Sequence, residues 1–172
     1  MVRSNVALIG FMGAGKSAVG RALASRKNRT FVETDSLVEQ RAGMSIGDIF
    51  SRFGEEWFRE LESEIISRVT QMTDAVISCG GGAVLREQNV AALKESSIVV
   101  FLDVAPETVL QRIGSGSRIR PLLDEPDRES RVRQLIVIRQ PLYLSSADIV
   151  VQTDAISIEQ VVRRVEEELV RV

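Results

Sequence analysis

The feature that most constrains this chain is an eight-residue stretch, GFMGAGKS, from Gly10 to Ser17. It fits the pattern G-x-x-x-x-G-K-[ST], in which glycines let successive backbone N–H groups turn inward around phosphate oxygens. A buried strand must precede such a loop and a helix must follow it. The apolar run 5–9 and the amphipathic stretch 17–26 meet both conditions. The sequence therefore predicts a nucleotide-binding loop in which Lys16 contacts the β/γ-phosphates and the Ser17 hydroxyl contacts Mg²⁺.

Length and composition are typical of a single globular domain, so residues 1–172 are expected to fold as one unit. The hydrophobic fraction is 44% and the mean hydropathy is +0.05. No apolar run approaches the roughly 18 residues of a membrane span. The few residues before the first apolar run leave no room for a signal peptide. We therefore expect a cytoplasmic protein with no membrane partner.

Residue counts exclude several classes of chemistry. The chain has no histidine and a single cysteine, Cys79, which excludes a histidine-based triad, a zinc site and an internal disulfide. Acid–base chemistry is therefore expected from carboxylates, lysine or tyrosine. The net charge of -2 and the pI near 5.4 argue against a general nucleic-acid surface, although arginines cluster between Arg112 and Arg139.

Apolar periodicity predicts strands and helices that alternate along the chain. This alternation favours the α/β class: one parallel β-α-β domain with about five strands and helices on both faces. The expected strands are 5–9, 30–35, 75–78, 98–103 and 147–151, and the expected helices are 17–26, 37–42, 45–54, 55–72, 86–94, 106–113, 127–140 and 157 onward.

Glycine, proline and serine set several of these boundaries. Gly54 is expected to end one short helix before a long one begins. Pro141 is expected to end its helix, because proline lacks the N–H that the helix needs. The segment 114–130 is dominated by Gly, Ser, Pro and charged residues, which is typical of a mobile surface segment. Ser157 followed by Gln160 predicts a capping box for the last helix.

Six motifs in register make the chain similar to the shikimate kinases over essentially its whole length. The phosphate loop GFMGAGKSAVGRALA is followed by ETD, GEEWFRELE, the glycine triplet 80–82, RPLL at 120–123, and RQPLY leading into AD. Each motif alone is common, but their order and spacing match the family. The resemblance implies a three-layer P-loop kinase fold with five parallel strands in the order 2-3-1-4-5. It also implies an acceptor-binding region at about 33–61 and a mobile lid at about 114–126.

The resemblance implies the activity as well. Members transfer the γ-phosphoryl group of ATP to the 3-hydroxyl of shikimate in aromatic amino-acid (chorismate) biosynthesis, with ATP and Mg²⁺ as cofactors. Shikimate is then the partner of this chain, and we expect a monomer that binds no nucleic acid. Contacts to ATP are expected from the loop and the turn after it, at Gly13, Ala14, Gly15, Lys16, Ser17 and Ala18.

The family's acceptor-binding positions can also be interpreted from residue chemistry alone. Asp35 is a strand-end carboxylate that accepts or orients a hydroxyl proton, or else only the N-cap of the next helix. Arginines bind a carboxylate bidentately, or else form surface salt bridges. A glycine triplet admits a ligand close to the backbone, or else only makes a tight turn. The positions implied by the resemblance are Asp35, Arg59, Gly80, Gly81, Gly82 and Arg139.

Further arginines are assigned to the nucleotide. Arg120 precedes proline in the lid, and the resemblance implies that it stabilises the transferring phosphoryl group, as a third catalytic residue beside Lys16 and Asp35. Arg118 takes this place in a competing alignment. Arg112 is expected near the adenine or the phosphates, unless it only complements the dipole of its own helix.

Two positions depart from the family's pattern. Glu33 stands where members usually have the Asp that helps to hold Mg²⁺ with Ser17, and its longer arm changes the geometry available to the metal. Gln152 stands in the adenine site where members often have arginine, so a cation–π contact of about 0.5 to 2 kcal/mol would be missing. Among rare residues, Cys79 is expected to be a small buried filler and Trp57 to pack under the acceptor region.

Two other functions remain open at this point. A related small-molecule kinase, such as a gluconate-type enzyme, would share the phosphate loop but have a different acceptor pocket, and a polyol acceptor without a carboxylate would give Arg59 and Arg139 nothing to bind. A shikimate-binding sensor module with little turnover would keep the whole site. Glu33 is the one departure that motivates the sensor.

Overall fold

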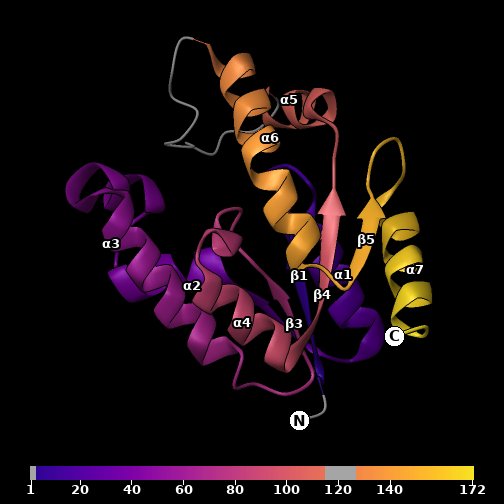
Figure 1. The fold of residues 1–172 in the computed structure, drawn as a ribbon. Coiled ribbons are helices and arrows are strands. Elements are labelled where there is room, and N and C mark those ends of the chain that lie inside the picture. The colour runs from indigo at the N-terminus through magenta and orange to yellow at the C-terminus, as the bar shows by residue number, and fades with distance from the viewer. Residues whose placement is uncertain (1–2, 115–126) are drawn as a thin grey trace.

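The structure, a computed structural model, describes residues 3–114 and 127–172. A central sheet is covered by helices on both faces (Figure 1). The strands are β1 (Asn5–Ile9), β2 (Thr30–Glu33), β3 (Ala75–Ser78), β4 (Ser97–Asp103) and β5 (Ile149–Gln152). The helices are α1 (Lys16–Lys27), α2 (Thr34–Ala42), α3 (Ile46–Val69), α4 (Glu87–Ser96), α5 (Pro106–Gly114), α6 (Arg128–Ser146) and α7 (Ile158–Leu169), with a short 3₁₀ helix η1 (Ala83–Leu85).

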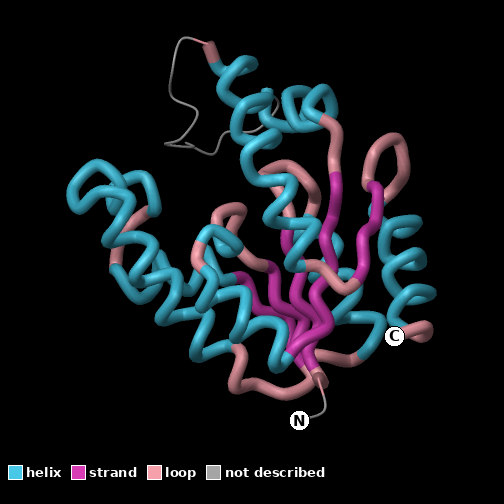
Figure 2. The backbone as a smooth tube through the Cα atoms, in the orientation of Figure 1, coloured by secondary structure: helices cyan, strands magenta, loops and turns pink. Residues whose placement is uncertain are grey.

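All pairings in the sheet are parallel, and the strand order is β2-β3-β1-β4-β5, which confirms the expected order. The central strand β1 pairs through Val6 with Val76 on one side and with Ile98 on the other. All five residues of β1 are buried, as expected for a strand covered on both faces. Because every strand is parallel, all carboxyl ends open onto one edge of the sheet (Figure 2).

Different helices cover the two faces of the sheet. Helices α1 and α7 pack against each other on one face, and α4 and α6 contact β4 on the other. Helix α2 packs along α3, and the N-terminal part of α3 extends away from the sheet (Figure 1). At the start of α7, Ser157 and Gln160 exchange both hydrogen bonds of the predicted capping box. None of the helices described is both long and apolar enough to cross a membrane.

Two expected boundaries are wrong. The second strand ends at Glu33 rather than at residue 35, because α2 begins at Thr34, so Asp35 lies in the first turn of a helix. There its carboxylate is favoured by the positive end of the helix dipole. Helix α6 does not stop at Pro141 but continues through it to Ser146. Burial of Tyr143 beyond the proline, at 2% exposure, offsets the lost backbone hydrogen bond.

Gly54 breaks the helix as predicted, but the two halves remain joined as α3. Its φ of 82° and ψ of 174° are non-helical, and the chain then resumes helical geometry. Trp57, expected to pack under the acceptor region, is 37% exposed and stacks on Phe53 across this break, with ring centroids 4.8 Å apart. The candidate lid falls mainly on 115–126, which lie outside the described residues, as do Arg118 and Arg120.

Candidate active site

The loop between β1 and α1 depends on glycines in backbone conformations that other residues rarely adopt. Gly10, Gly13 and Gly15 have φ values of 140°, 80° and 92°. A Cβ atom on Gly10 would lie 2.5 Å from the carbonyl oxygen of Leu102, so the loop also passes too close to β4 for a side chain. The loop therefore turns tightly from the sheet edge into the N-terminus of α1.

The N-terminus of α1 has the features of an anion site. Its N-cap, Gly15, offers no side-chain hydrogen bond, and the first turn contains no acidic residue. Backbone N–H groups and the helix dipole at such an end favour a phosphate. The Lys16 ammonium folds back over the loop and donates to the carbonyl oxygens of Gly10 at 2.8 Å and Phe11 at 2.9 Å. The positive charge is thus held beside the phosphate cradle.

Ser17 and Glu33 meet directly across α1 and β2. The Ser17 hydroxyl donates to Oε1 of Glu33, while Oε2 accepts from Arg21 and from Ser36, each at 3.1 Å. A hydroxyl and a carboxylate side by side provide the hard oxygen donors that Mg²⁺ prefers, with the remaining positions left to water and phosphate oxygens. Over the described residues no larger group of metal-ligating side chains occurs. The donor set therefore fits a phosphate-bound Mg²⁺.

Asp35 lies against the glycine triplet after β3. Thr34, fully buried beside it, accepts a hydrogen bond from the Gly80 amide at 2.9 Å and so ties the start of α2 to the end of β3. A Cβ atom on Gly80 would lie 2.5 Å from Oδ1 of Asp35 and 2.7 Å from Oε1 of Glu62. The absence of a side chain at position 80 therefore allows two carboxylates to approach the same point.

Arg59 is buried in a network of carboxylates. Its Nη1 donates to Glu62 at 2.7 Å, while Nε and Nη2 donate to Glu55 at 3.2 and 3.0 Å. Glu62 has no exposed surface, and its second oxygen has no hydrogen-bond partner. Arg59 is thus a buried charged group and not the surface salt bridge that the sequence left open as an alternative. These hydrogen bonds fix the orientation of the Arg59 guanidinium beside the glycine triplet.

Burial and charge shift both pKa values of this pair upward. Burial raises the pKa of Glu62 and nearby Asp35 adds to the rise, while Arg59 opposes it. For Arg59, burial alone lowers the pKa, but attraction to Glu62 and Glu55 outweighs it, and the pKa is raised. The pair therefore retains a proton more strongly than either side chain alone in water.

Arg139 and Tyr143 on α6 complete the wall beside the triplet. The carbonyl oxygen of Gly81 accepts from Arg139 Nη1 at 3.4 Å and from the Tyr143 hydroxyl. Arg139 is only 4% exposed, and its guanidinium lies 6.0 Å from the ring centroid of Phe11 in the phosphate loop. One buried arginine therefore adjoins both the phosphate loop and the acceptor region.

Arg112 and Gln152 lie at the other side of the phosphate loop. Arg112 donates to the carbonyl oxygens of Gly13 at 2.8 Å and Thr153 at 3.1 Å, so it joins the loop to the segment after β5 rather than only complementing its helix. Gln152 donates to Asp103 at 2.6 Å. This is the region where the sequence predicts the adenine.

Four residues outside the predicted set contact it: Thr34, Glu55, Glu62 and Tyr143. The signal for Glu55 and Glu62 was present in their spacing of four and three residues from Arg59 on one helix. Cys79 behaves as expected: burial raises its thiol pKa to about 12, which leaves it a neutral filler.

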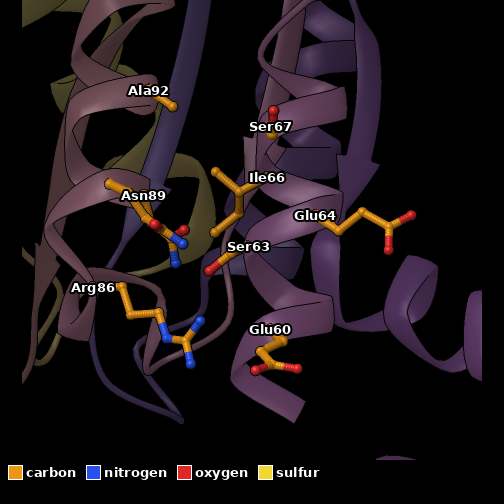
Figure 3. Close-up of a pocket in the computed structure, with 9 residues that line it drawn as sticks. Glu60, Ser63, Glu64, Ile66, Ser67, Arg86, Asn89 and Ala92 are labelled. Carbon is orange, nitrogen blue, oxygen red and sulfur yellow. The ribbon is translucent and has the colours of Figure 1, made fainter. Parts of the chain in front are cut away.

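A separate groove lies between α3 and α4, away from the phosphate loop (Figure 3). Its volume is about 450 Å³, and Glu60, Ser63, Arg86 and Asn89 are among the residues that line it. None of the predicted site residues lines this groove. Cavity size alone therefore does not identify the candidate active site, whereas the convergence of charged groups does.

The close approach of Gly82 to Arg59 predicts that alanine substitutions at Gly82 and Gly81 differ in their effect on stability. A Cβ at Gly82 would lie 2.1 Å from Arg59 Nη1, so Gly82→Ala should push the guanidinium off Glu62 and reduce the free energy of unfolding by about 1 to 3 kcal/mol. Gly81→Ala is the matched control, because its Cβ meets nothing closer than 3.5 Å. Urea unfolding measures both. Equal stability of the two variants would contradict the packing described for Arg59.

The environment of Tyr143 predicts its titration. Burial raises the pKa of this tyrosine, the single one in the chain, to about 12. Since the native state favours the neutral phenol, the stability it contributes is lost as pH rises from about 10 toward 12. Phenolate absorbance should therefore show a midpoint near 12 in the native protein and near 10 in urea. A native midpoint near 10 would place the hydroxyl in water.

The sequence and the fold of this chain are both similar to those of known proteins. A family model described as shikimate kinase matches residues 12–170. A shikimate kinase of Symbiobacterium thermophilum is 46% identical over 96% of this chain and 95% of its own length. The structure of shikimate kinase from Acinetobacter baumannii in complex with shikimate is 34% identical, with a TM-score of 0.94 over 99% of this chain and 94% of that one.

A gluconokinase from Sinorhizobium meliloti covers 98% of this chain and 93% of its own with a TM-score of 0.63, but at 18% identity it shares the fold alone. The likeness to shikimate kinases is much closer in both sequence and structure, and it covers the phosphate loop, the triplet and both arginine-bearing helices. This chain belongs to the shikimate kinase family.

Proposed function

We propose that this protein is a shikimate kinase that transfers the γ-phosphoryl group of MgATP to the 3-hydroxyl of shikimate, in aromatic amino-acid biosynthesis. The observation that carries the proposal is a single edge of the sheet where a phosphate loop adjoins two buried arginines and a carboxylate. The reaction needs both parts together, because phosphoryl transfer depends on positioning and on charge stabilisation rather than on covalent chemistry.

On the donor side, the backbone N–H groups of the loop and of the first turn of α1 bind the phosphates. Lys16, now resting on two loop carbonyls, is close enough to move onto the β/γ-phosphates and neutralise charge as the γ-phosphoryl group leaves. The contacting residues are Gly13, Ala14, Gly15, Lys16, Ser17 and Ala18.

Ser17 and Glu33 would hold the metal. When bound, Mg²⁺ would supply positive charge that offsets the negative charge of the phosphates. The Ser17 hydroxyl donates a hydrogen bond to Glu33, so the lone pairs of the serine oxygen remain available to a metal. Glu33 supplies a carboxylate beside that ligand, so the residue that departs from the family pattern still brings an acidic oxygen to the same place.

Asp35 acts on the acceptor hydroxyl. Its place in the first turn of α2, held to the triplet through Thr34, directs the carboxylate toward Gly80, which supports this role. A carboxylate there accepts a hydrogen bond from the attacking hydroxyl, orients it, and takes its proton as the new bond forms. The backbones of Gly80, Gly81 and Gly82 supply the close approach that the ring hydroxyls need.

Arg59 and Arg139 bind the substrate carboxylate. Both are nearly buried, so their charges act in a weakly screened environment, and guanidinium groups bind carboxylates with directional paired hydrogen bonds. A neutral polyol acceptor would leave them without an anion, which argues against a kinase for such acceptors. Gluconate also carries a carboxylate, so a panel of acceptors distinguishes the gluconate-type alternative, while turnover itself distinguishes a kinase from a sensor.

The remaining roles concern the nucleotide and the state of the protein. Arg112 braces the phosphate loop and Gln152 borders the adenine, while Arg120 in the lid supplies charge to the transferring group. Arg118 is the alternative to Arg120. We also propose that the protein acts as a monomer in the cytoplasm, where its substrate and ATP occur, and that it binds no nucleic acid.

Shikimate-dependent release of ADP, in a coupled assay with MgATP, tests the proposed function directly. Lys16→Ala should abolish turnover, because the γ-phosphoryl charge loses its counter-charge, while calorimetric binding of shikimate remains close to the wild-type value. Purified wild-type protein that binds shikimate tightly but turns over at background would favour the sensor. Absence of both binding and turnover would end the proposal.

Arg139→Ala should act on acceptor binding. Loss of a charge-assisted contact of about 1.5 to 3 kcal/mol predicts a shikimate KM raised about ten- to a hundredfold. Arg133→Ala is the control on the same helix, since Arg133 is exposed and paired with Glu107 and Glu129. An unchanged KM in Arg139→Ala would remove this arginine from the carboxylate site.

A further inference from the structure

Arg59 is bound by two carboxylates whose surroundings differ strongly. The side chain of Glu62 is 1% exposed, whereas that of Glu55 is 48% exposed. Glu62 lies in the interior and cannot leave Arg59 without stranding a buried charge. Glu55 can turn into water at small cost, because a half-exposed ion pair contributes little. The two carboxylates are therefore suited to different roles.

Glu55 occupies the edge of the guanidinium that a substrate carboxylate requires. One oxygen of Glu55 accepts from both Nε and Nη2, which together form an adjacent pair of donors. Gly82 lies close to the end of the guanidinium that carries Nη1 and Nη2: a Cβ atom added at this glycine would lie 2.1 and 2.4 Å from these atoms, and Nη1 already donates to Glu62. The pair of donors open to an incoming carboxylate is thus the pair that Glu55 now holds.

Local charge favours the same displacement. Arg59 and Arg139 supply two positive charges to this edge, against the carboxylates of Asp35, Glu55 and Glu62. A substrate carboxylate would be the fourth. Departure of Glu55 would keep the cluster at three carboxylates, and its position just after the break at Gly54 leaves it at the start of a helical segment, where negative charge is favourable.

We propose that Glu55 is a placeholder for the substrate carboxylate: it holds the Nε–Nη2 edge of Arg59 until an acceptor carboxylate displaces it. This inference rests on the proposed function, since it names the event that accompanies acceptor binding. Glu55 is then a specificity determinant, because only an acceptor bearing an anionic group can replace one carboxylate by another. Glu62 remains as the permanent partner that fixes the orientation of Arg59.

The test compares Glu55→Gln with Glu56→Gln by calorimetric titration of shikimate into the protein with Mg²⁺ and without nucleotide. Each variant removes one negative charge from adjacent positions, but Glu56 is 81% exposed and pairs with Arg86 at the groove in Figure 3. Glu55→Gln should bind shikimate about two- to fivefold more tightly, because an amide competes less well for the guanidinium than a carboxylate. Glu56→Gln should match the wild type.

A neutral ligand distinguishes competition from a general change in the pocket. With the methyl ester of shikimate, the gain in affinity from Glu55→Gln should disappear, since no anion competes for Arg59. Thermal unfolding checks that both variants fold. Weaker or unchanged shikimate binding in Glu55→Gln, or an equal gain with the ester, would overturn the placeholder role alone. Wild-type protein that neither binds nor phosphorylates shikimate would overturn the proposed function, and this inference with it.

Discussion

Parallel pairing throughout the sheet is the constraint on which the site depends. Every strand ends at the same edge, so the loop after β1, the helix after β2 and the triplet after β3 meet although they are far apart in sequence. The order of the strands then determines which of these segments are neighbours. Because β3 lies between β1 and β2, the phosphate loop after β1 lies near the triplet after β3, and Asp35, the proposed acceptor residue, follows β2 beside that triplet.

The proposed acceptor region contains charged side chains that are buried at a cost in desolvation. Arg59, Glu62 and Arg139 are all 5% exposed or less, and a buried pair is costly to desolvate even when it is well bonded. The glycine triplet leaves room for these groups, since side chains at Gly80 or Gly82 would occupy the positions of their charged ends. A rigid, weakly screened site is the result, which favours selective binding of a small anion.

Much of this arrangement follows from patterns that are local in sequence. The phosphate loop is a local backbone motif, and the order of the strands followed from the resemblance carried by motifs such as RQPLY. The burial of Arg59 was not predictable from its helix, because the cover over it comes from Gly82, which lies in another segment. The position of Trp57 was not predictable either: its partner Phe53 lies on the other side of the helix break at Gly54, so periodicity within one helix does not reveal their stacking.

Glu33 shows how one departure can be absorbed without the loss of a donor. It is the residue that precedes α2, close to the first turn of α1, so its carboxylate lies where two helices begin. An additional methylene lets one oxygen reach Ser17 while the other accepts from Arg21 and Ser36. The serine is thereby held by a direct hydrogen bond, with its lone pairs left over. The longer carboxylate thus keeps a hydroxyl and an acidic oxygen side by side, which are the hard oxygen donors that Mg²⁺ prefers.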